Sequence, residues 1–140
     1  MIVADASFAL KLVLVEEDSR IALELWRDWV EQGEEIVAPR LFRAETMSGV
    51  RRRHYRRLLT QEQAEAAYSV LDGLEIDLLE PSDTYGVARR FAEEFNRPNI
   101  YASCCLALAE IAGGELWTAD RRLANAIGMQ LPWVNLLGSR

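Results

Sequence analysis

Ile2-Val3-Ala4-Asp5-Ala6-Ser7 decides the fold of this chain, because a short apolar run that stops at an aspartate predicts a buried strand with a carboxylate at its carboxyl end. The same arrangement returns late in the chain, where Leu116-Trp117-Thr118-Ala119 is followed by Asp120. Open α/β sheets bind ligands beside the carboxyl ends of their strands. We therefore expect Asp5 and Asp120 at one edge of one sheet, in the place where a ligand would bind.

Between these two runs, segments of strand length alternate with helical patterns. The expected strands are residues 1–5, 35–38, 75–79, 115–119 and 133–136, and the expected helices are residues 7–15, 18–32, 40–57, 60–73, 82–95, 99–113 and 121–128. The expected helix-start residues are Pro39, Thr60, Ser82, Asn99 and Asp120, and the expected stops are Gly33, Gly73, Gly113 and Gly128. This order predicts a single three-layer α/β domain over residues 1–140, with a mainly parallel central sheet flanked by helices.

Composition narrows the class of protein. The chain has 140 residues, half of them hydrophobic, which predicts one soluble domain. No stretch is long and apolar enough to span a membrane, and the apolar run 8–15 contains Lys11 and has no basic leader, so we expect no signal peptide and a cytoplasmic protein. A net charge of −6 argues against loose, charge-driven binding of nucleic acid and leaves room only for a local basic surface.

The cysteine and histidine content argues against zinc and disulfides. Cys104 and Cys105 are adjacent, so they cannot form an ordinary structural disulfide, and they lie in an almost wholly apolar predicted helix where buried packing is expected. His54 is the only histidine. No His/Cys zinc set can be assembled from these three residues.

Glu45 is a third carboxylate of interest. It follows Phe42 and Leu41 by three and four positions, so it shares their apolar helix face, where an ionised group is costly without a partner. The alternative is a glutamate at the edge of the core that reaches solvent. Asp120 has a second interpretation too, as the N-cap of the following helix, and the two roles can coexist.

A cluster of these carboxylates would need a partner. Two ionised carboxylates about 4 Å apart repel by roughly 4 kcal/mol at an effective dielectric of 20. The sequence therefore predicts a cation, shared protons or a basic partner at this place, without deciding among them.

A basic and aromatic segment follows Glu45 on the same predicted helix. Its residues are Arg51-Arg52-Arg53-His54-Tyr55-Arg56-Arg57. Arg51, Arg52, Arg53 and Arg56 could hold an RNA backbone, with Tyr55 available to stack, or the segment could be a solvated helix end whose cations complement the helix dipole. Two tryptophans on the second predicted helix, Trp26 and Trp29, fit either core packing or a contact with another protein.

Several segments in a fixed order resemble the PIN-domain family, especially the toxin subunits of VapBC toxin–antitoxin pairs. They are residues 2–7, Pro39-Arg40-Leu41-Phe42-Arg43-Ala44-Glu45, Tyr101-Ala102-Ser103-Cys104-Cys105-Leu106-Ala107-Leu108-Ala109-Glu110 and Leu116-Trp117-Thr118-Ala119-Asp120-Arg121-Arg122-Leu123. The resemblance runs nearly end to end. It implies a metal-dependent endoribonuclease with an acidic Mg²⁺ or Mn²⁺ site, acting on RNA, usually a homodimer and held inactive by a cognate antitoxin protein.

The resemblance also implies roles for individual residues. Asp5, Glu45 and Asp120 match the acidic positions of the family as catalytic and metal-binding residues, and Ser7 and Thr118 match hydroxyl positions beside them. The family commonly has a further aspartate where this chain has Ala102, in the first turn of a predicted helix, on the face continued by Cys105, Leu106 and Ala109. Asn99, one turn earlier, could offer a carbonyl oxygen to the site or could cap the helix.

Two functions follow from this comparison of motifs. The first is a ribonuclease toxin weakened by the missing carboxylate at Ala102. The second is a catalytically silent PIN-like protein that binds an antitoxin or RNA without cleaving it.

Overall fold

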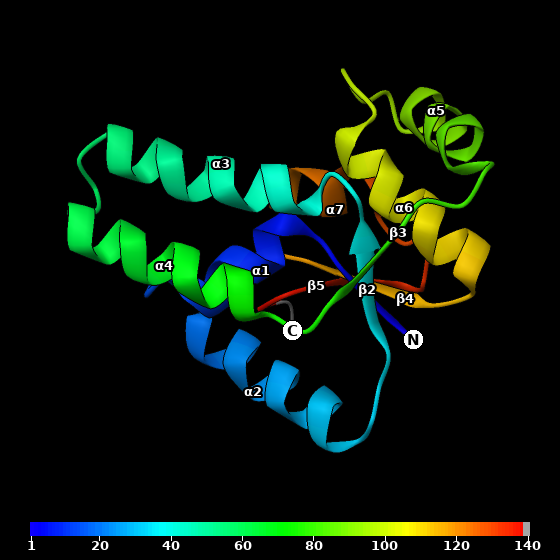
Figure 1. The fold of residues 1–140 in the computed structure, drawn as a ribbon. Coiled ribbons are helices and arrows are strands. Elements are labelled where there is room, and N and C mark those ends of the chain that lie inside the picture. The colour runs from blue at the N-terminus through cyan, green and yellow to red at the C-terminus, as the bar shows by residue number, and fades with distance from the viewer. Residues whose placement is uncertain (139–140) are drawn as a thin grey trace.

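The computed structural model describes residues 1–138 (Figure 1). Their strands form one sheet of five strands in the order β3-β2-β1-β4-β5, and every neighbouring pair is parallel. The strands are β1 (Ile2–Ala4), β2 (Ile36–Pro39), β3 (Asp77–Leu79), β4 (Glu115–Thr118) and β5 (Val134–Leu136). The helices are α1 (Ala6–Val13), α2 (Ser19–Glu31), α3 (Phe42–Tyr55), α4 (Gln61–Gly73), α5 (Thr84–Glu94), α6 (Tyr101–Ala112) and α7 (Arg121–Ile127).

The two faces of the sheet bury different helices, because alternate residues of a strand point to opposite sides. Ile2 and Ala4 of β1 belong to a core cluster that includes residues of α1 and α2. Val3, between them, belongs to a second cluster with residues of α5, α6 and α7. The predicted three-layer α/β architecture with a parallel central sheet is therefore confirmed.

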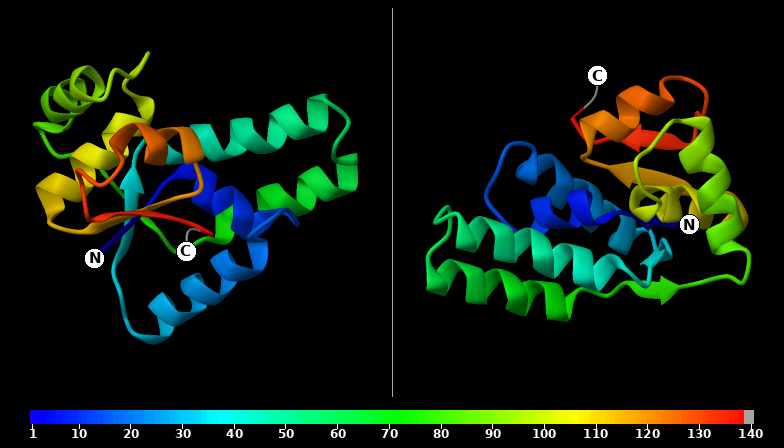
Figure 2. Two further views of the ribbon diagram at one scale, coloured as in Figure 1. Left: turned by 180° about the vertical axis from the view of Figure 1, so that it is seen from behind. Right: turned by 90° about the horizontal axis from the view of Figure 1, so that it is seen from above.

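Helices α3 and α4 form an antiparallel pair that reaches past the sheet (Figures 1 and 2). A third core cluster joins this pair to α1 through Leu10, Val50 and Leu71, among others. Gly49 makes the approach possible, because a Cβ built on it would lie 2.5 Å from Leu10 Cδ1. The start of α3 is thus held beside α1 and the end of β1.

All the predicted strands and helices are present, and no end differs by more than two residues. Thr60 forms a capping box with Gln63 at the start of α4, as predicted. Three predicted helix starts are wrong. For α6, Ile100 and not Asn99 is the N-cap. Pro39 remains in β2, paired with Leu79 of β3, and α3 begins three residues later. The N-cap of α5 is Asp83 and not Ser82. The Ser82 hydroxyl donates a hydrogen bond of 3.1 Å to the Asp83 carboxylate.

The position of Trp29 decides between the two interpretations of this residue, core packing and a contact with another protein. Its ring lies between Phe8 and Trp117, at centroid distances of 5.3 and 5.6 Å, and it is buried. Trp26 packs against the same cluster at 6.4 Å from Trp29 and is half-buried. Core packing therefore accounts for the spacing of these two tryptophans. Within residues 1–138, no helix has the length and hydropathy needed to cross a membrane.

Candidate acidic site at the carboxyl end of the sheet

Asp5 occupies the turn between β1 and α1. Its Oδ1 accepts hydrogen bonds from the Phe8 backbone N–H at 2.9 Å and from the Ser7 hydroxyl at 2.7 Å, so Asp5 is the N-cap of α1. Ser7 lies inside the first turn of α1, and its hydroxyl donates to Asp5. The Asp5 residue is only 8% exposed.

Asp120 has the equivalent position after β4. Its Oδ1 accepts from the backbone N–H groups of Arg122 at 3.0 Å and Leu123 at 3.2 Å, which makes it the N-cap of α7. Strands β1 and β4 are parallel neighbours in which Ala4 lies opposite Trp117. Asp5 and Asp120 therefore leave the sheet at the same edge, as the sequence predicts.

Two hydroxyl groups connect the aspartate loops. The Ser7 Oγ accepts from the Ala119 N–H at 2.8 Å and lies 3.2 Å from Thr118 Oγ1. Thr118 Oγ1 in turn accepts from the Asp120 N–H at 3.0 Å, and Thr118 is fully buried. Ser7 and Thr118 thus fix the orientation of both loops, because each hydroxyl has partners on its neighbours.

A pocket of about 490 Å³ opens at this edge. Its lining includes two of the three predicted acids, Glu45 from α3 and Asp120, together with Ser7; the other lining residues are Ala6, Leu10, Leu41, Ala44, Ser48, Arg52 and Tyr101. Asp5 is buried directly before Ala6. The fold therefore brings the three carboxylates to one region, although they lie on segments up to 115 residues apart in the sequence.

Burial and mutual repulsion change the acidity of this group. Burial raises the pKa of Asp5, against the lowering effect of the Thr118 and Ser7 hydroxyls and the Phe8 N–H, and the charge of Asp120 raises it further. Burial also raises the pKa of Glu45, the charge of Asp5 adds to the rise, and Arg52 opposes it. These carboxyl groups interact and would be stabilised in their ionised form by a cation.

The donor set fits a hard divalent cation. Mg²⁺ in proteins is usually held by one or two carboxylates, and waters and phosphate oxygens complete its shell. Among residues 1–138, no group of three His, Cys, Asp or Glu side chains is arranged so that it could bind one metal ion. Glu45 and Asp120 offer carboxylate oxygens at an open pocket, with Asp5 buried beside it, which suits a partly hydrated ion and not a closed protein cage.

Ala102 lies in the first turn of α6 and is half-buried against the cluster that contains Cys105. The Cys105 thiol, one turn later, is buried, and its pKa is raised first by burial and then by the charges of Asp5 and Glu45. Ala102 itself packs against this apolar cluster and is not among the residues that line the acidic pocket. A role for position 102 in the site therefore stays a prediction.

Asn99 is not brought into the pocket. Its Oδ1 accepts from the Tyr101 N–H at 3.1 Å, a contact with the first residue of α6. The pocket lining does not include it.

The four arginines singled out in the sequence lie in different surroundings. Arg52 lines the acidic pocket, and Arg51 lies 5.5 Å from the centre of the Tyr55 ring. Arg53 points elsewhere: it forms two hydrogen bonds with the Glu16 carboxylate, at 2.8 and 3.2 Å, and a third with Gly49 O at 2.9 Å. Arg56 is exposed at the end of α3.

Tyr101 lines the pocket, although the sequence analysis predicts no role for it. It is the first residue of α6, it is 54% exposed, and it lines the acidic pocket. The signal for it was weak, because a tyrosine that opens an apolar helix usually needs no explanation beyond the helix itself.

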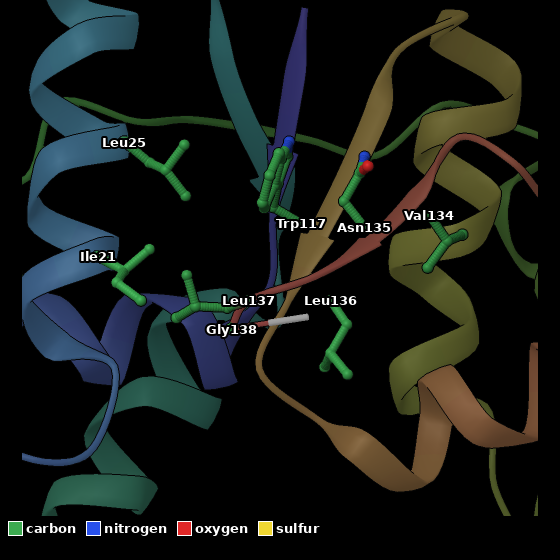
Figure 3. A pocket seen from close by; sticks show the side chains of 8 residues that line it. All are labelled: Ile21, Leu25, Trp117, Val134, Asn135, Leu136, Leu137 and Gly138. Atoms are coloured by element: carbon green, nitrogen blue, oxygen red, sulfur yellow. The ribbon is translucent and has the colours of Figure 1, made fainter. Parts of the chain in front are cut away.

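A second cavity, of about 430 Å³, lies between α2 and the strands β4 and β5 (Figure 3). Its lining is mainly apolar, with Leu25, Trp117 and Leu137 among its residues, and it includes no carboxylate. The buried Trp117 Nε1 has no hydrogen-bond partner within the described part of the chain. This cavity offers no acid–base or metal-binding group, so the acidic pocket remains the candidate site.

Comparison with known proteins identifies a matching family and solved structures that have a similar fold. The sequence matches the family described as PIN domain over residues 2–128. Solved structures with this fold include a toxin–antitoxin complex from Klebsiella pneumoniae, with a TM-score of 0.68 and 16% identity over 100% of both chains. Another is PAE2754 from Pyrobaculum aerophilum, with a TM-score of 0.61 and 20% identity over 89% of this chain and 83% of that one. No curated protein matches the sequence.

Proposed function

This chain belongs to the PIN domain family, and we propose that it is a toxin-type nuclease of that family, a Mg²⁺- or Mn²⁺-dependent endoribonuclease with activity reduced by Ala102. PIN domains are generally nucleases that use divalent metal ions. The observation that carries the proposal is that Glu45 and Asp120 line one pocket beside the carboxyl ends of β1 and β4, with the buried Asp5 close enough for its charge to act on Glu45.

Each residue has a part in the proposed reaction. Asp5 and Asp120 would hold the ion directly or through water, and Glu45 would either complete the ligand set or orient the water that attacks the phosphodiester. A divalent ion bound there supplies a more acidic water and neutralises charge on the phosphate. Ser7 and Thr118 keep the aspartate loops in place through the hydrogen bonds described above. In both aspartates, Oδ1 is the oxygen that accepts the capping hydrogen bond from a backbone N–H of the following helix.

Ala102 reduces the proposed activity. It lies one turn before Cys105, whose thiol feels the charges of Asp5 and Glu45, and a methyl group at this position supplies no oxygen to an ion or to its waters. One fewer carboxylate lowers the affinity of an oxygen-ligand site for Mg²⁺. This same observation favours a second candidate, a catalytically silent PIN-like protein that binds an antitoxin or RNA without cleaving it.

We propose a cognate antitoxin as the protein partner, a homodimer as the assembly and the cytoplasm as the location. The Klebsiella pneumoniae structure with this fold is a toxin–antitoxin complex, which supports an antitoxin partner. Carboxylates whose pKa values are raised by burial and repulsion would be stabilised by a cationic side chain. We expect the antitoxin to place an arginine or lysine in the acidic pocket, and a complex that leaves this pocket open to solvent would contradict that expectation.

An RNA-cleavage assay tests the nuclease against the silent protein. The chain and its Ala102→Asp and Asp5→Asn variants are incubated with a mixed RNA substrate in chelator, in Mg²⁺ and in Mn²⁺. The expected result is weak metal-dependent cleavage by the chain, roughly tenfold or more faster cleavage by Ala102→Asp, and none by Asp5→Asn. Cleavage by neither the chain nor Ala102→Asp would support the silent protein instead.

A further inference from the structure

We propose that Tyr101 and Arg52 hold the RNA substrate at the acidic pocket, Tyr101 by stacking on one unpaired base and Arg52 by pairing with the neighbouring phosphate. This inference deepens the proposed function and rests on it. It names two side chains that bind the substrate, neither of which belongs to the acidic set.

Tyr101 has the properties of a stacking platform. Its side chain is exposed at the pocket, and its backbone N–H is fixed by a hydrogen bond to the Asn99 side chain, which holds the start of α6. Within residues 1–138, its hydroxyl makes no hydrogen bond. An aromatic ring that is exposed and anchored at its base presents an open π-face, on which any nucleobase can stack.

The other aromatic side chains of this surface are occupied or lie elsewhere. The Tyr55 ring carries the Arg51 guanidinium. Tyr85, on α5, donates a hydrogen bond to Glu80 and does not line the pocket. Tyr101 is therefore the aromatic side chain placed to meet a base at the acids.

Arg52 is a cation that lines the same pocket. It comes from α3, whereas Tyr101 comes from α6, and no ion pair within the described chain engages it. Its charge acts on Glu45, which places the guanidinium near the acids. Because a guanidinium pairs with phosphate oxygens through two N–H groups, Arg52 is suited to the backbone of a bound strand.

The pocket between these two side chains has a shape and lining that suit a base. Its volume of about 490 Å³ lies within the range of small-molecule sites, about 300–1,000 Å³. Ala6, Leu10, Leu41 and Ala44 give it an apolar wall. A base inside a duplex cannot reach such a wall or the Tyr101 ring without leaving its stack, and that requirement selects single strands, loops and ends.

The test is a binding measurement with a short RNA that contains one 2-aminopurine. Fluorescence is recorded on mixing with protein in Mg²⁺, for the single strand and for the same strand in a duplex. Tyr101→Ala should weaken binding of the single strand about five- to 150-fold, the equivalent of one lost stacked base, and abolish the fluorescence quench. Tyr101→Phe should keep both, and Tyr85→Ala, an exposed tyrosine outside the pocket, should change neither.

The arginine is tested with a matched pair. Arg52→Ala and Arg56→Ala each remove one positive charge, in the last turn of α3 and just after it. Of these two arginines, only Arg52 lines the pocket. Arg52→Ala should weaken binding more than Arg56→Ala at the same low salt concentration, and it should lower the dependence of binding on salt by about one phosphate contact. Equal losses for the two variants would overturn the role of Arg52.

The outcomes separate this inference from the nuclease proposal. Equal binding and equal quench for Tyr101→Ala and Tyr101→Phe would overturn the inference, even if the chain cleaves RNA. Tyr101-dependent binding of single strands by a protein that cleaves nothing would support the inference and contradict the nuclease. Tighter binding of the duplex than of the single strand would also overturn it.

Discussion

Asp5 serves two purposes that make opposite demands on its charge. As the N-cap of α1 it accepts hydrogen bonds from the Phe8 N–H and the Ser7 hydroxyl, which an aspartate and an asparagine can accept about equally well. As a proposed ligand it must be ionised, yet among residues 1–138 it is the only buried carboxyl, and burial raises its pKa. The hydrogen bonds that Asp5 accepts as an N-cap stabilise the fold, whereas its negative charge would stabilise a bound metal ion.

Replacement of Asp5 by asparagine should therefore stabilise the protein in chelator at neutral pH. A carboxyl whose pKa is raised in the folded state contributes stability below its unfolded pKa of about 3.9, and this contribution is lost as pH rises through the folded value. Asparagine avoids that loss. We expect a gain on the order of 1 kcal/mol, or a few degrees in melting temperature, which shrinks toward pH 4.

Thermal melts between pH 4 and pH 8, in chelator and in Mg²⁺, measure this prediction. Saturating Mg²⁺ should stabilise the unchanged chain more than the Asp5→Asn variant, because the variant lacks the anionic ligand. A variant that melts lower than the chain in chelator at pH 7, or whose difference is the same at every pH, would show that the charge of Asp5 is well compensated without metal.

At the scale of elements, the sequence predicts the ends of strands well and long-range side-chain pairs poorly. Asp5 and Asp120 could be placed together because parallel strands bring their carboxyl ends to one edge. The orientation of Ser7 could not, because its hydroxyl bonds to a backbone N–H 112 positions away. Arg53 was grouped with the possible RNA-binding arginines for the same reason: its partner, Glu16, is 37 positions earlier and leaves no local signal.

The Glu16–Arg53 pair fastens α3 to the segment after α1. Its side chains are 30% and 26% exposed, and both guanidinium contacts reach one carboxylate. Burial opposes ionisation of Glu16, but the hydrogen bonds and charges of Arg53 and Lys11 outweigh it and lower its pKa. The pair and the close contact of Gly49 with Leu10 together set where α3, and with it Glu45, lies against α1.

Arg53→Met should accordingly destabilise the fold by about 1–2 kcal/mol at neutral pH, because it removes charge-assisted hydrogen bonds to a partly buried carboxylate. A lowered pKa contributes stability above the unfolded pKa and loses it as pH falls through the folded value, so the effect should disappear in acid. Urea melts of Arg53→Met, Glu16→Gln and the double variant give the coupling. Arg56→Met, an exposed change just after α3, is the control.

An Arg53 that acted only on RNA would give a different pattern. Arg53→Met would then melt like Arg56→Met, and the double variant with Glu16→Gln would show additive effects. RNA affinity, measured at matched stability, would fall instead.

At the scale of the whole molecule, the fold concentrates opposite charges at one end of an acidic protein. The net charge is −6, yet Arg52 and the exposed Arg56 come from the same part of the chain that brings Glu45 to the acids. Overall charge slows the approach of any polyanion, so the proposed RNA binding would depend on this local arrangement and on a cation held by the carboxylates. In the proposed function, stability, metal binding and RNA binding would be linked through the same small group of side chains.

That linkage predicts the behaviour of Ala102→Asp in thermal melts. In chelator, a further carboxylate one turn before Cys105, whose thiol feels the charges of Asp5 and Glu45, would add repulsion and desolvation, so the variant should melt lower than the chain. With Mg²⁺ or Mn²⁺ it should regain stability and respond at lower metal concentration, because binding to the folded state adds about 2.7 kcal/mol at one hundred times the dissociation constant. Ala102→Asn, of the same size without the charge, should show a smaller loss in chelator and a smaller metal response. An identical metal response of all three proteins would place position 102 outside the metal site and leave the missing carboxylate without consequence for activity.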